Sequence, residues 1–462
     1  MKNKILSLFV SALIGCTYTS CTDLSDTVYS EITEEDFMSD PKSLDILMGQ
    51  VYAKLGGPIA DCSVWFNEST ADCMIVPFRN VSNEWNGSNH IEKYTHTWNP
   101  KNADLKKLWD RSFSIVTAIN LILPQIESSS MNETTKLQYD AELRMVRAYV
   151  YYNIIDHWGD VPLITSKDVK MEELTKTSSA DIYKFMMNEF KECLPYLSHD
   201  NKNMYGRMHY YAALALKARY LINANVFLDT ERKDNVYPFE NEGLDECIDV
   251  CTEIIEDGGY KLEPDYFTNF KSDNEGSTEN IFVIPFHRTY SMGVFGNAAQ
   301  GFNLPRYCLH NSEQVYYGEN VGNLWNGFSA LPSMYYSFKS DDLRLKGWRV
   351  GLQTYNGEPL KCQKTGNMGD DLNFTIDWEI EECNEYDGAR LAKYEFPNDL
   401  VGYSADNDFP VIRYADILLM KAEAIMRKNN WIATSEAVSL VNDVRNRSFE
   451  NSASKDYYEY ET

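Results

Sequence analysis

Apolar residues recur every three or four positions through most of the first half of the chain. Behind Asp40 and Pro41, an N-cap residue and a proline at the first helical position, Leu44, Leu47 and Val51 fall on one helical face. Including this first segment, the spacing predicts eight helices, readable as four pairs. The other seven are predicted over residues 104–126, 133–158, 179–197, 207–226, 244–257, 414–428 and 433–447.

One predicted helix carries unusually small side chains. In residues 208–224, "MHYYAALALKARYLINA", the small positions are Ala212, Ala213, Ala215 and Ala218. Small residues let neighbouring helices approach closely, as helix-pair repeats require. The sequence shows no clean 34-residue period, so the pattern alone makes a repeat superhelix only one candidate architecture.

The pattern changes between residues 260 and 408. Gly, Asn, Tyr and Pro become frequent, and the short apolar run "NIFVIPF" (residues 280–286) predicts a strand. Turns are expected at residues 355–357 and 366–369. An irregular aromatic insertion among helices is a usual place for binding loops. We therefore expect a leader over residues 1–20, helical regions over 21–257 and 410–462, and a ligand-binding lobe over 258–409.

The N-terminus has the parts of a secretory signal. Lys2 and Lys4 precede an apolar run that is too short to span a bilayer, and small residues follow. A signal that ends on a cysteine resembles that of a bacterial lipoprotein. Cys16 fits the general cleavage motif better, whereas Cys21 gives the more usual signal length and is followed at once by a polar, acidic stretch. We expect lipidation at Cys21, with Cys16 as the alternative and an uncleaved leader as the remaining possibility.

Composition excludes some partners. The 43 basic and 69 acidic residues give a net charge of −26, which becomes −28 if Lys2 and Lys4 leave with the leader. Such a chain repels phosphate backbones, so we expect no nucleic-acid ligand. The 31 tyrosines and 9 tryptophans suit partly wet binding surfaces, although a tyrosine-rich core would account for them equally.

Catalytic and metal-binding motifs are absent from the sequence. It contains no HExxH, GxSxG or Walker motif, and no GxGxxG after a predicted strand. Cys247 and Cys251 lie four apart on a predicted helix, without histidine companions, and are expected to be buried thiols. Glycoside hydrolysis requires two carboxylates that are close in space but not necessarily in sequence. The sequence does not single out such a pair among its acidic residues. We expect no enzyme activity, no cofactor and no metal.

Several blocks, in order, resemble the SusD/RagB family of outer-membrane lipoproteins of Bacteroidetes. They are the leader with "SCTDL", "RMVRAYVYYNIIDHWGDVPLI" (residues 144–164), "EIIEDGGYKLEPDYFTNF" (residues 253–270), "DNDFPVIRYADILLMKAEAIMR" (residues 406–427) and "VNDVRNRS" (residues 441–448). The resemblance implies a mostly α fold: a right-handed superhelix of four tetratricopeptide-like helix pairs with an irregular lobe containing short strands. It departs at the C-terminus, where members usually continue into a further segment, so the chain is expected to be a shortened form.

The same resemblance implies a function. Family members lie as a hinged lid over a SusC-like TonB-dependent transporter and pass oligosaccharides, or in some cases peptides, to it. We therefore expect a non-enzymatic glycan-binding lipoprotein, anchored by lipid in the cell outer membrane and exposed at the surface. The alternatives are a RagB-like peptide-binding protein, an outer-membrane scaffold of helical repeats and a helical glycoside hydrolase.

Sugar binding needs flat aromatic faces and planar hydrogen-bonding groups. Residues 76–98 supply both and resemble a family segment of the ligand face, with Arg79 and Asn86 as hydrogen-bonding groups and Trp85 as a platform. From the irregular lobe we add Tyr290 and the turn residues Trp325 and Asn326. Taken individually, residues of these kinds are more often structural than ligand-contacting.

Overall fold

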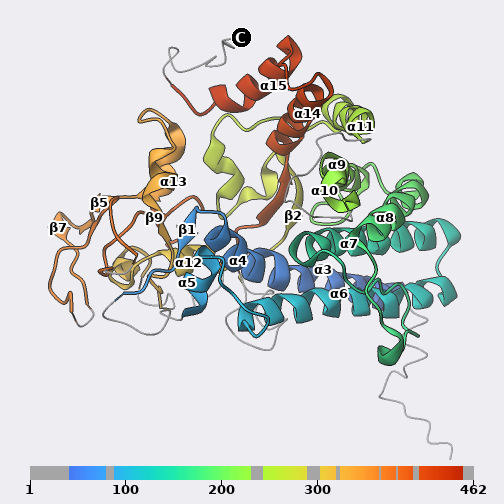
Figure 1. Ribbon diagram of the computed structural model, residues 1–462, viewed down its shortest axis with the longest axis horizontal. Helices are drawn as coiled ribbons and strands as arrows, with labels where there is room; N and C mark the ends of the chain where they lie inside the picture. The colour runs from blue at the N-terminus through green and yellow to red at the C-terminus, as the bar shows by residue number, and fades with distance from the viewer. Residues whose placement is uncertain are drawn as a thin grey trace, which may run out of the picture.

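Helices stand side by side in one half of the molecule, and loops with very short strands make up the other half (Figure 1). The chain is described by a computed structural model over residues 41–79, 88–229, 243–288, 302–318, 323–363, 366–380, 383–398 and 405–450. The cysteines predicted to carry the lipid, Cys16 and Cys21, lie outside these residues. Among the helices described, none has a stretch long and apolar enough to cross a bilayer.

The helices of the body follow the predicted periodicity. They are α3 (Pro41–Leu55), η1 (Gly56–Cys62), α4 (Ser63–Thr70), α5 (Ser88–Tyr94), α6 (Ala103–Ser128), α7 (Glu133–Trp158), η2 (Met171–Glu173), α8 (Ser179–Cys193), η3 (Leu194–Tyr196), α9 (Tyr210–Ile222), α10 (Ala224–Leu228), α11 (Leu244–Asp257), α14 (Tyr414–Lys428) and α15 (Ser435–Asn446).

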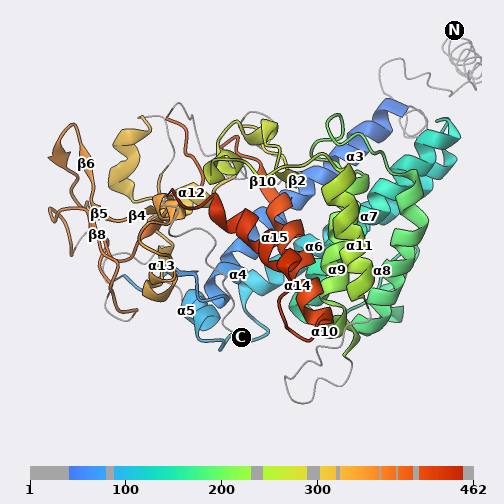
Figure 2. The same cartoon turned by 90° about the horizontal axis from the view of Figure 1, so that it is seen from above.

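Long helices pack as consecutive pairs. α3 packs on α6, α7 on α8, α9 on α11, and α14 on α15. The pairs also touch one another through α6 with α7, α8 with α9, and α11 with α14, so they follow in a row across the body (Figure 2). This arrangement confirms the predicted mostly α fold built from four helix pairs.

Two predicted helices differ from the observed ones by several residues at their ends. The helix expected to reach residue 197 ends at Cys193 and continues as the tighter turn η3. The helix expected over 207–226 begins at Tyr210, because His209 lies before it in extended conformation and its Nδ1 accepts the N–H of Ala212 at 3.3 Å. The same segment breaks at Asn223, which separates α9 from α10.

The alanines of α9 are where the close approach of helices requires them. Ala212, Ala213, Ala215 and Ala218 are all fully buried. α9 contacts α7, α8, α11 and α14, so its small face lies at the centre of the helical body. A larger side chain at these positions would separate the pairs.

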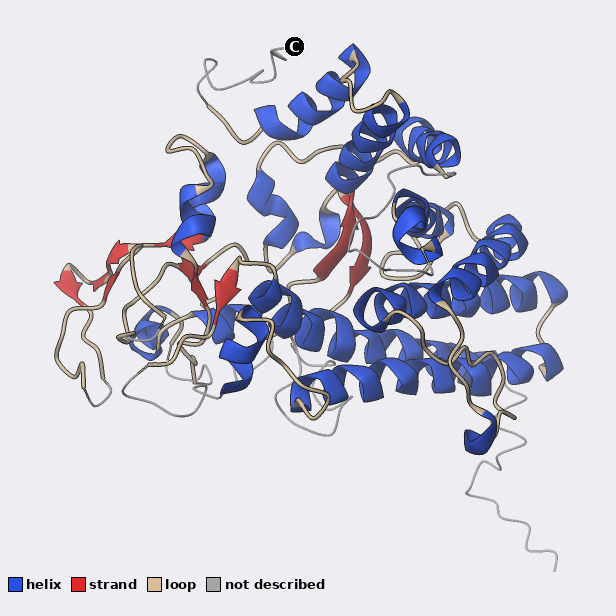
Figure 3. Ribbon diagram, viewed as in Figure 1, coloured by secondary structure: helices blue, strands red, loops and turns tan. Residues whose placement is uncertain are grey.

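The lobe contains short helices and strands connected by loops (Figure 3). Its helical turns are η4 (Tyr266–Phe270), η5 (Asn274–Gly276), α12 (Leu304–Cys308), η6 (Asn311–Tyr316), α13 (Pro332–Tyr336) and η7 (Leu343–Gly347). The antiparallel strand pairs are β1 (Met74–Ile75) with β3 (Ser329–Ala330), β2 (Asn280–Ile284) with β10 (Phe409–Arg413), β4 (Trp348–Arg349) with β9 (Arg390–Leu391), β5 (Gly351–Leu352) with β8 (Asn373–Phe374), and β6 (Thr354–Tyr355) with β7 (Glu358–Pro359).

The predicted strand and the predicted turn at residues 355–357 are both present. β2 lies within the apolar run 280–286 and is buried at every position. Asn356 and Gly357 connect β6 to β7 with φ angles of 52° and 85°, the left-handed conformation that this dipeptide adopts readily in a tight hairpin.

One apolar core extends from the body into the lobe. Its members include Leu216 of α9, Phe282 of β2, and Phe302 and Phe328 of the lobe. A separate small cluster of Cys362, Leu372 and Phe374 lies beneath the hairpins. The larger core is continuous across both regions. The domain boundaries expected at residues 257 and 409 therefore stay predictions.

Candidate functional site

The turn containing Trp325 and Asn326 is held rigidly on α12. The N–H groups of Trp325, Asn326 and Gly327 donate to the carbonyl oxygens of Arg306, Leu309 and Tyr307 at 3.0, 2.8 and 2.8 Å. Asn326 has a φ of 52°, which its short polar side chain tolerates.

The indole of Trp325 is half-buried. The Arg306 guanidinium lies 5.0 Å from its ring centroid, and the Tyr307 ring lies 5.2 Å away. These two neighbours and the rigid turn fix the orientation of the Trp325 ring, which lowers the entropic cost of using it to bind a ligand.

Arg79 and Asn326 are brought together, but inside the protein. Nη1 of Arg79 donates to the carbonyl oxygens of Asn326 at 2.7 Å and Gly327 at 2.9 Å, and Nη2 donates to Oγ of Ser329 at 2.7 Å. The two residues are only 4% and 5% exposed. Their contacts anchor the turn that carries Trp325, and a direct role for them in ligand binding stays a prediction.

A buried arginine completes this network. Nε and Nη2 of Arg390 donate to Oδ1 of Asn326 at 3.1 and 2.8 Å. Burial, together with the neighbouring charge of Arg79, lowers the pKa of Arg390 to about 9. The amide of Asn326 is thus occupied on both sides, since its Nδ2 donates to the carbonyl oxygen of Glu385 at 3.0 Å. The other predicted site residues, Trp85, Asn86 and Tyr290, lie outside the described residues.

A shallow groove lies elsewhere on the lobe. It has a volume of about 400 Å³ and is lined in part by Tyr316, Tyr317, Arg349 and Phe396. The guanidinium of Arg349 donates to Glu313 at 2.6 Å and to the phenol oxygen of Tyr317 at 2.5 Å. The guanidinium that lines this groove is therefore already paired within the protein.

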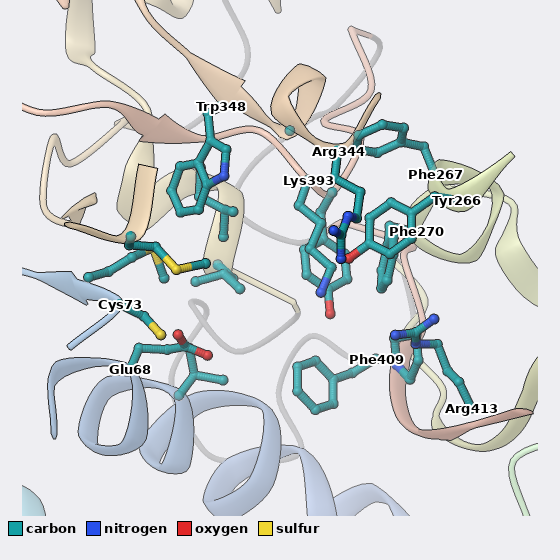
Figure 4. A pocket seen from close by; sticks show the side chains of 18 of the residues that line it. Glu68, Cys73, Tyr266, Phe267, Phe270, Arg344, Trp348, Lys393, Phe409 and Arg413 are labelled. Atoms are coloured by element: carbon teal, nitrogen blue, oxygen red, sulfur yellow. The ribbon is translucent and has the colours of Figure 1, made fainter. Parts of the chain in front are cut away.

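A deeper cavity lies where the helical body meets the lobe (Figure 4). Its volume is about 430 Å³, and residues of α4, β1, η4, η7, β9 and β10 contribute to its walls. Its charged lining includes Glu68, Arg344, Lys393 and Arg413. Its aromatic lining consists of Tyr266, Phe267, Phe270, Phe338, Trp348, Tyr394 and Phe409.

Sequence reasoning missed this cavity. Tyr266, Phe267 and Phe270 lie in a family-like block that reads as scaffold, while Lys393 belongs to a segment without a recognisable pattern. Glu68 lies on another segment far away in the sequence. No periodic signal could have connected them.

Three buried residues, His310, Cys362 and Glu385, come close enough to be tested as a metal site. His310 Nδ1 accepts the N–H of Ser312 at 3.0 Å, so a neutral ring carries its proton on Nε2. That Nε2 lies 3.4 Å from Glu385, and a protonated nitrogen cannot bind a metal. Burial also raises the pKa of Cys362 to about 12, so the thiol keeps its proton. These three residues are therefore better described as a histidine and a thiol that face one carboxylate than as a metal centre.

Four helix pairs with an irregular lateral lobe define a helical-repeat protein. The chain belongs to the SusD family. A family model described as "Starch-binding associating with outer membrane" matches residues 29–222, and the SusD family model matches residues 379–461. The family suggested by the sequence blocks is therefore confirmed.

Curated relatives match over nearly the whole chain. A SusD-like protein of Bacteroides ovatus is 21% identical over 97% of this chain and 76% of its own length. The starch-binding protein SusD of Bacteroides thetaiotaomicron is 22% identical over 83% of this chain and 70% of its own length.

Solved structures share the fold. A laminarin-binding SusD-like protein aligns with a TM-score of 0.66 and 18% identity, covering 89% of this chain and 84% of its own. Surface glycan-binding protein A of Bacteroides thetaiotaomicron, solved with laminarihexaose, aligns with a TM-score of 0.66 and 17% identity, covering 88% and 83%.

Proposed function

We propose that this protein is a surface-exposed glycan-binding lipoprotein of the outer membrane. It captures oligosaccharides and delivers them to a SusC-like TonB-dependent transporter. Membership of the SusD family carries the proposal. The acidic net charge of −26 agrees with a neutral ligand better than with a sulfated polymer.

Trp325 is the described residue best suited to hold a sugar. Its half-buried indole can stack on the CH-rich face of a pyranose ring while Arg306 and Tyr307 keep it in place. Arg79 and Asn326 act from beneath by holding the turn. Trp85, Asn86 and Tyr290 are proposed to complete the ligand face, and binding involves no bond cleavage.

Isothermal titration of the mature chain against starch, laminarin and xyloglucan oligosaccharides tests the proposal. We expect saturable binding to at least one of them, weakened about tenfold or more by Trp325→Ala, which corresponds to about 1.4 kcal/mol. Trp431→Ala is the matched control, because Trp431 is 48% exposed at the end of α14. No binding by a folded chain would favour a peptide ligand or the scaffold role.

The anchor has a separate test. Mass spectrometry of the protein from membrane fractions is expected to find acylated Cys21 at the mature N-terminus. Cys21→Ala should then release the protein from the membrane, whereas Cys62→Ala should not, because Cys62 is a buried thiol of the folded body.

A further inference from the structure

Two charged groups that line the cavity of Figure 4, Lys393 and Glu68, form no ion pair with another residue that the structure describes. Two of its three basic side chains are satisfied: Arg344 donates to Asp342 at 2.6 Å, and Arg413 donates to Glu279 at 2.6 Å. The third, Lys393, forms no ion pair with any acid in the described part of the chain. Lys393 is half-buried, so its ammonium group has lost part of its hydration without gaining a counter-ion.

Aromatic rings surround this ammonium group. Nζ of Lys393 lies 4.2 Å from the ring centroid of Phe270, 5.8 Å from that of Tyr394 and 5.9 Å from that of Tyr266. The negative faces of the rings stabilise a cation in this position, but they do not neutralise its charge. The ammonium group is therefore held in place and can still pair with an anion.

Glu68 lines the same cavity from α4. Burial raises the pKa of its carboxyl, and the charge of Lys393 opposes that rise only in part. Among the described residues, the two side chains do not approach closely enough to form an ion pair with each other. Figure 4 shows open space between the Glu68 side chain and the group around Lys393. A ligand can thus offer an anion to Lys393 and a hydroxyl donor to Glu68.

The remaining walls suit a sugar ring. Trp348 lies on one side of the space, and Tyr266, Phe270 and Phe409 lie on the other (Figure 4). Aromatic faces stack on the CH-rich side of a pyranose, and the volume of about 430 Å³ falls within the range of small-ligand pockets.

From these features we propose that the cavity is a second ligand site, separate from Trp325, that binds a sugar acid: a pyranose bearing a carboxylate and hydroxyl groups. The carboxylate pairs with Lys393, a hydroxyl donates to Glu68, and the ring lies between Trp348 and the opposite aromatic wall. In a chain of net charge −26, an unpaired ammonium in an aromatic cavity concentrates attraction for an anion at one place. This site does not depend on whether oligosaccharides bind at Trp325.

Saturation-transfer NMR and titration of the mature chain with D-glucuronate and D-galacturonate test this inference. We expect saturable binding of at least one of them, at least tenfold weaker binding of glucose and of acetate, and a loss of at least tenfold in Lys393→Met. Lys184→Met changes the net charge equally on an exposed side chain of α8 and should bind as the wild type does.

Trp325→Ala should also leave sugar-acid binding unchanged, which separates this site from the proposed glycan site. Circular dichroism checks each fold, and Lys393→Gln replaces Lys393→Met if the latter unfolds. The proposal is overturned if the folded wild type binds neither sugar acid, or if the Lys393 variants bind as the wild type does. It is also overturned if acetate binds as tightly as the sugar acids, because the cavity would then recognise only a carboxylate.

Discussion

The helical body and the lobe are held together by different interactions. Apolar side chains fill most of the body, with Leu216 of α9 fully buried among the helices, and the body also buries an ion pair between Arg147 and Glu189 at 2.8 Å. The lobe has strands of two residues at most of its pairings, and a fully buried arginine, Arg390, connects its segments. Besides the Asn326 side chain, Arg390 donates to Oγ of Ser329 and to the carbonyl oxygens of Glu385, Asp387 and Gly388.

This difference has a consequence for tolerance to substitution. An apolar core loses stability in proportion to the atoms removed and the space left behind. A buried polar network loses more than the deleted contact, because each former partner remains buried without one. A substitution in the network of the lobe should therefore lower the free energy of unfolding more than a substitution in the apolar core of the body. This holds although the lobe contains fewer regular helices and strands.

Arg390→Met should give the largest effect. The substitution leaves Oδ1 of Asn326 and several carbonyl oxygens without their donor, and we expect a loss of about 3–5 kcal/mol in the free energy of unfolding. Hydrogen exchange should accelerate around β4 and β9 before α7 responds. Lys346→Met, at an exposed position of η7, should change little. Equal exchange across body and lobe would refute the idea that the network stabilises the lobe selectively.

Leu216→Ala tests the other region. Removal of this buried side chain should cost about 2–5 kcal/mol, measured by urea unfolding, with faster exchange in α7, α9 and α11. Leu419→Ala on α14 should cost less than about 1 kcal/mol, because Leu419 is 41% exposed. If the two leucines proved equally costly, burial would not be what stabilises the body.

The difference between apolar packing in the body and a polar network in the lobe also explains which features the sequence could predict. Helix spacing located α6 and α7 to within a few residues, and the alanines of α9 indicated close packing, because both signals are local and periodic. Arg79, Asn326 and Arg390 meet across more than 300 residues, and their network has no periodic signature. Residue type, a family-like segment and a turn sequence point to Arg79 and Asn326, but none of these signals distinguishes a ligand contact from a scaffold contact.

Asp408 lies at the junction of the two regions. It accepts the O–H of Tyr205 at 2.7 Å and the N–H of Phe286 at 2.8 Å. Burial raises its pKa to about 6, above the value of about 3.9 expected in the unfolded chain. The folded protein therefore holds this proton more tightly between these two values. The stabilisation that results from the raised pKa of Asp408 is fully present below about pH 4 and is lost as the pH rises through about 6.

Asp408→Asn should remove this pH dependence. Because Asn does not titrate, the difference in unfolding free energy between variant and wild type should shift in favour of the variant by about 1–3 kcal/mol from pH 4.5 to 7.5. Urea unfolding at both values measures it. Asp406→Asn is a nearby comparison, since Asp406 is paired with Arg288. A pH-independent difference for Asp408→Asn would mean that the pKa of this carboxyl is the same in the folded and unfolded states.

Asn132→Ala should have the smallest effect, because it removes one exposed polar contact of the body. Oδ1 of Asn132 accepts the N–H of Thr135 at 3.0 Å and caps α7 at an exposed end. We expect a loss of about 0.5–2 kcal/mol by thermal or urea unfolding, and less than about 0.5 kcal/mol for the neighbouring exposed Thr134→Ala.

Water can replace the lost acceptor at this exposed helix end, whereas it cannot easily reach the partners of Arg390 inside the lobe. The ratio between the Arg390 and Asn132 effects thus compares a buried network of six hydrogen bonds with one exposed helix cap. If Asn132→Ala cost as much as Arg390→Met, the body would depend on its polar caps as strongly as the lobe depends on its network, and the contrast between the two regions would fail.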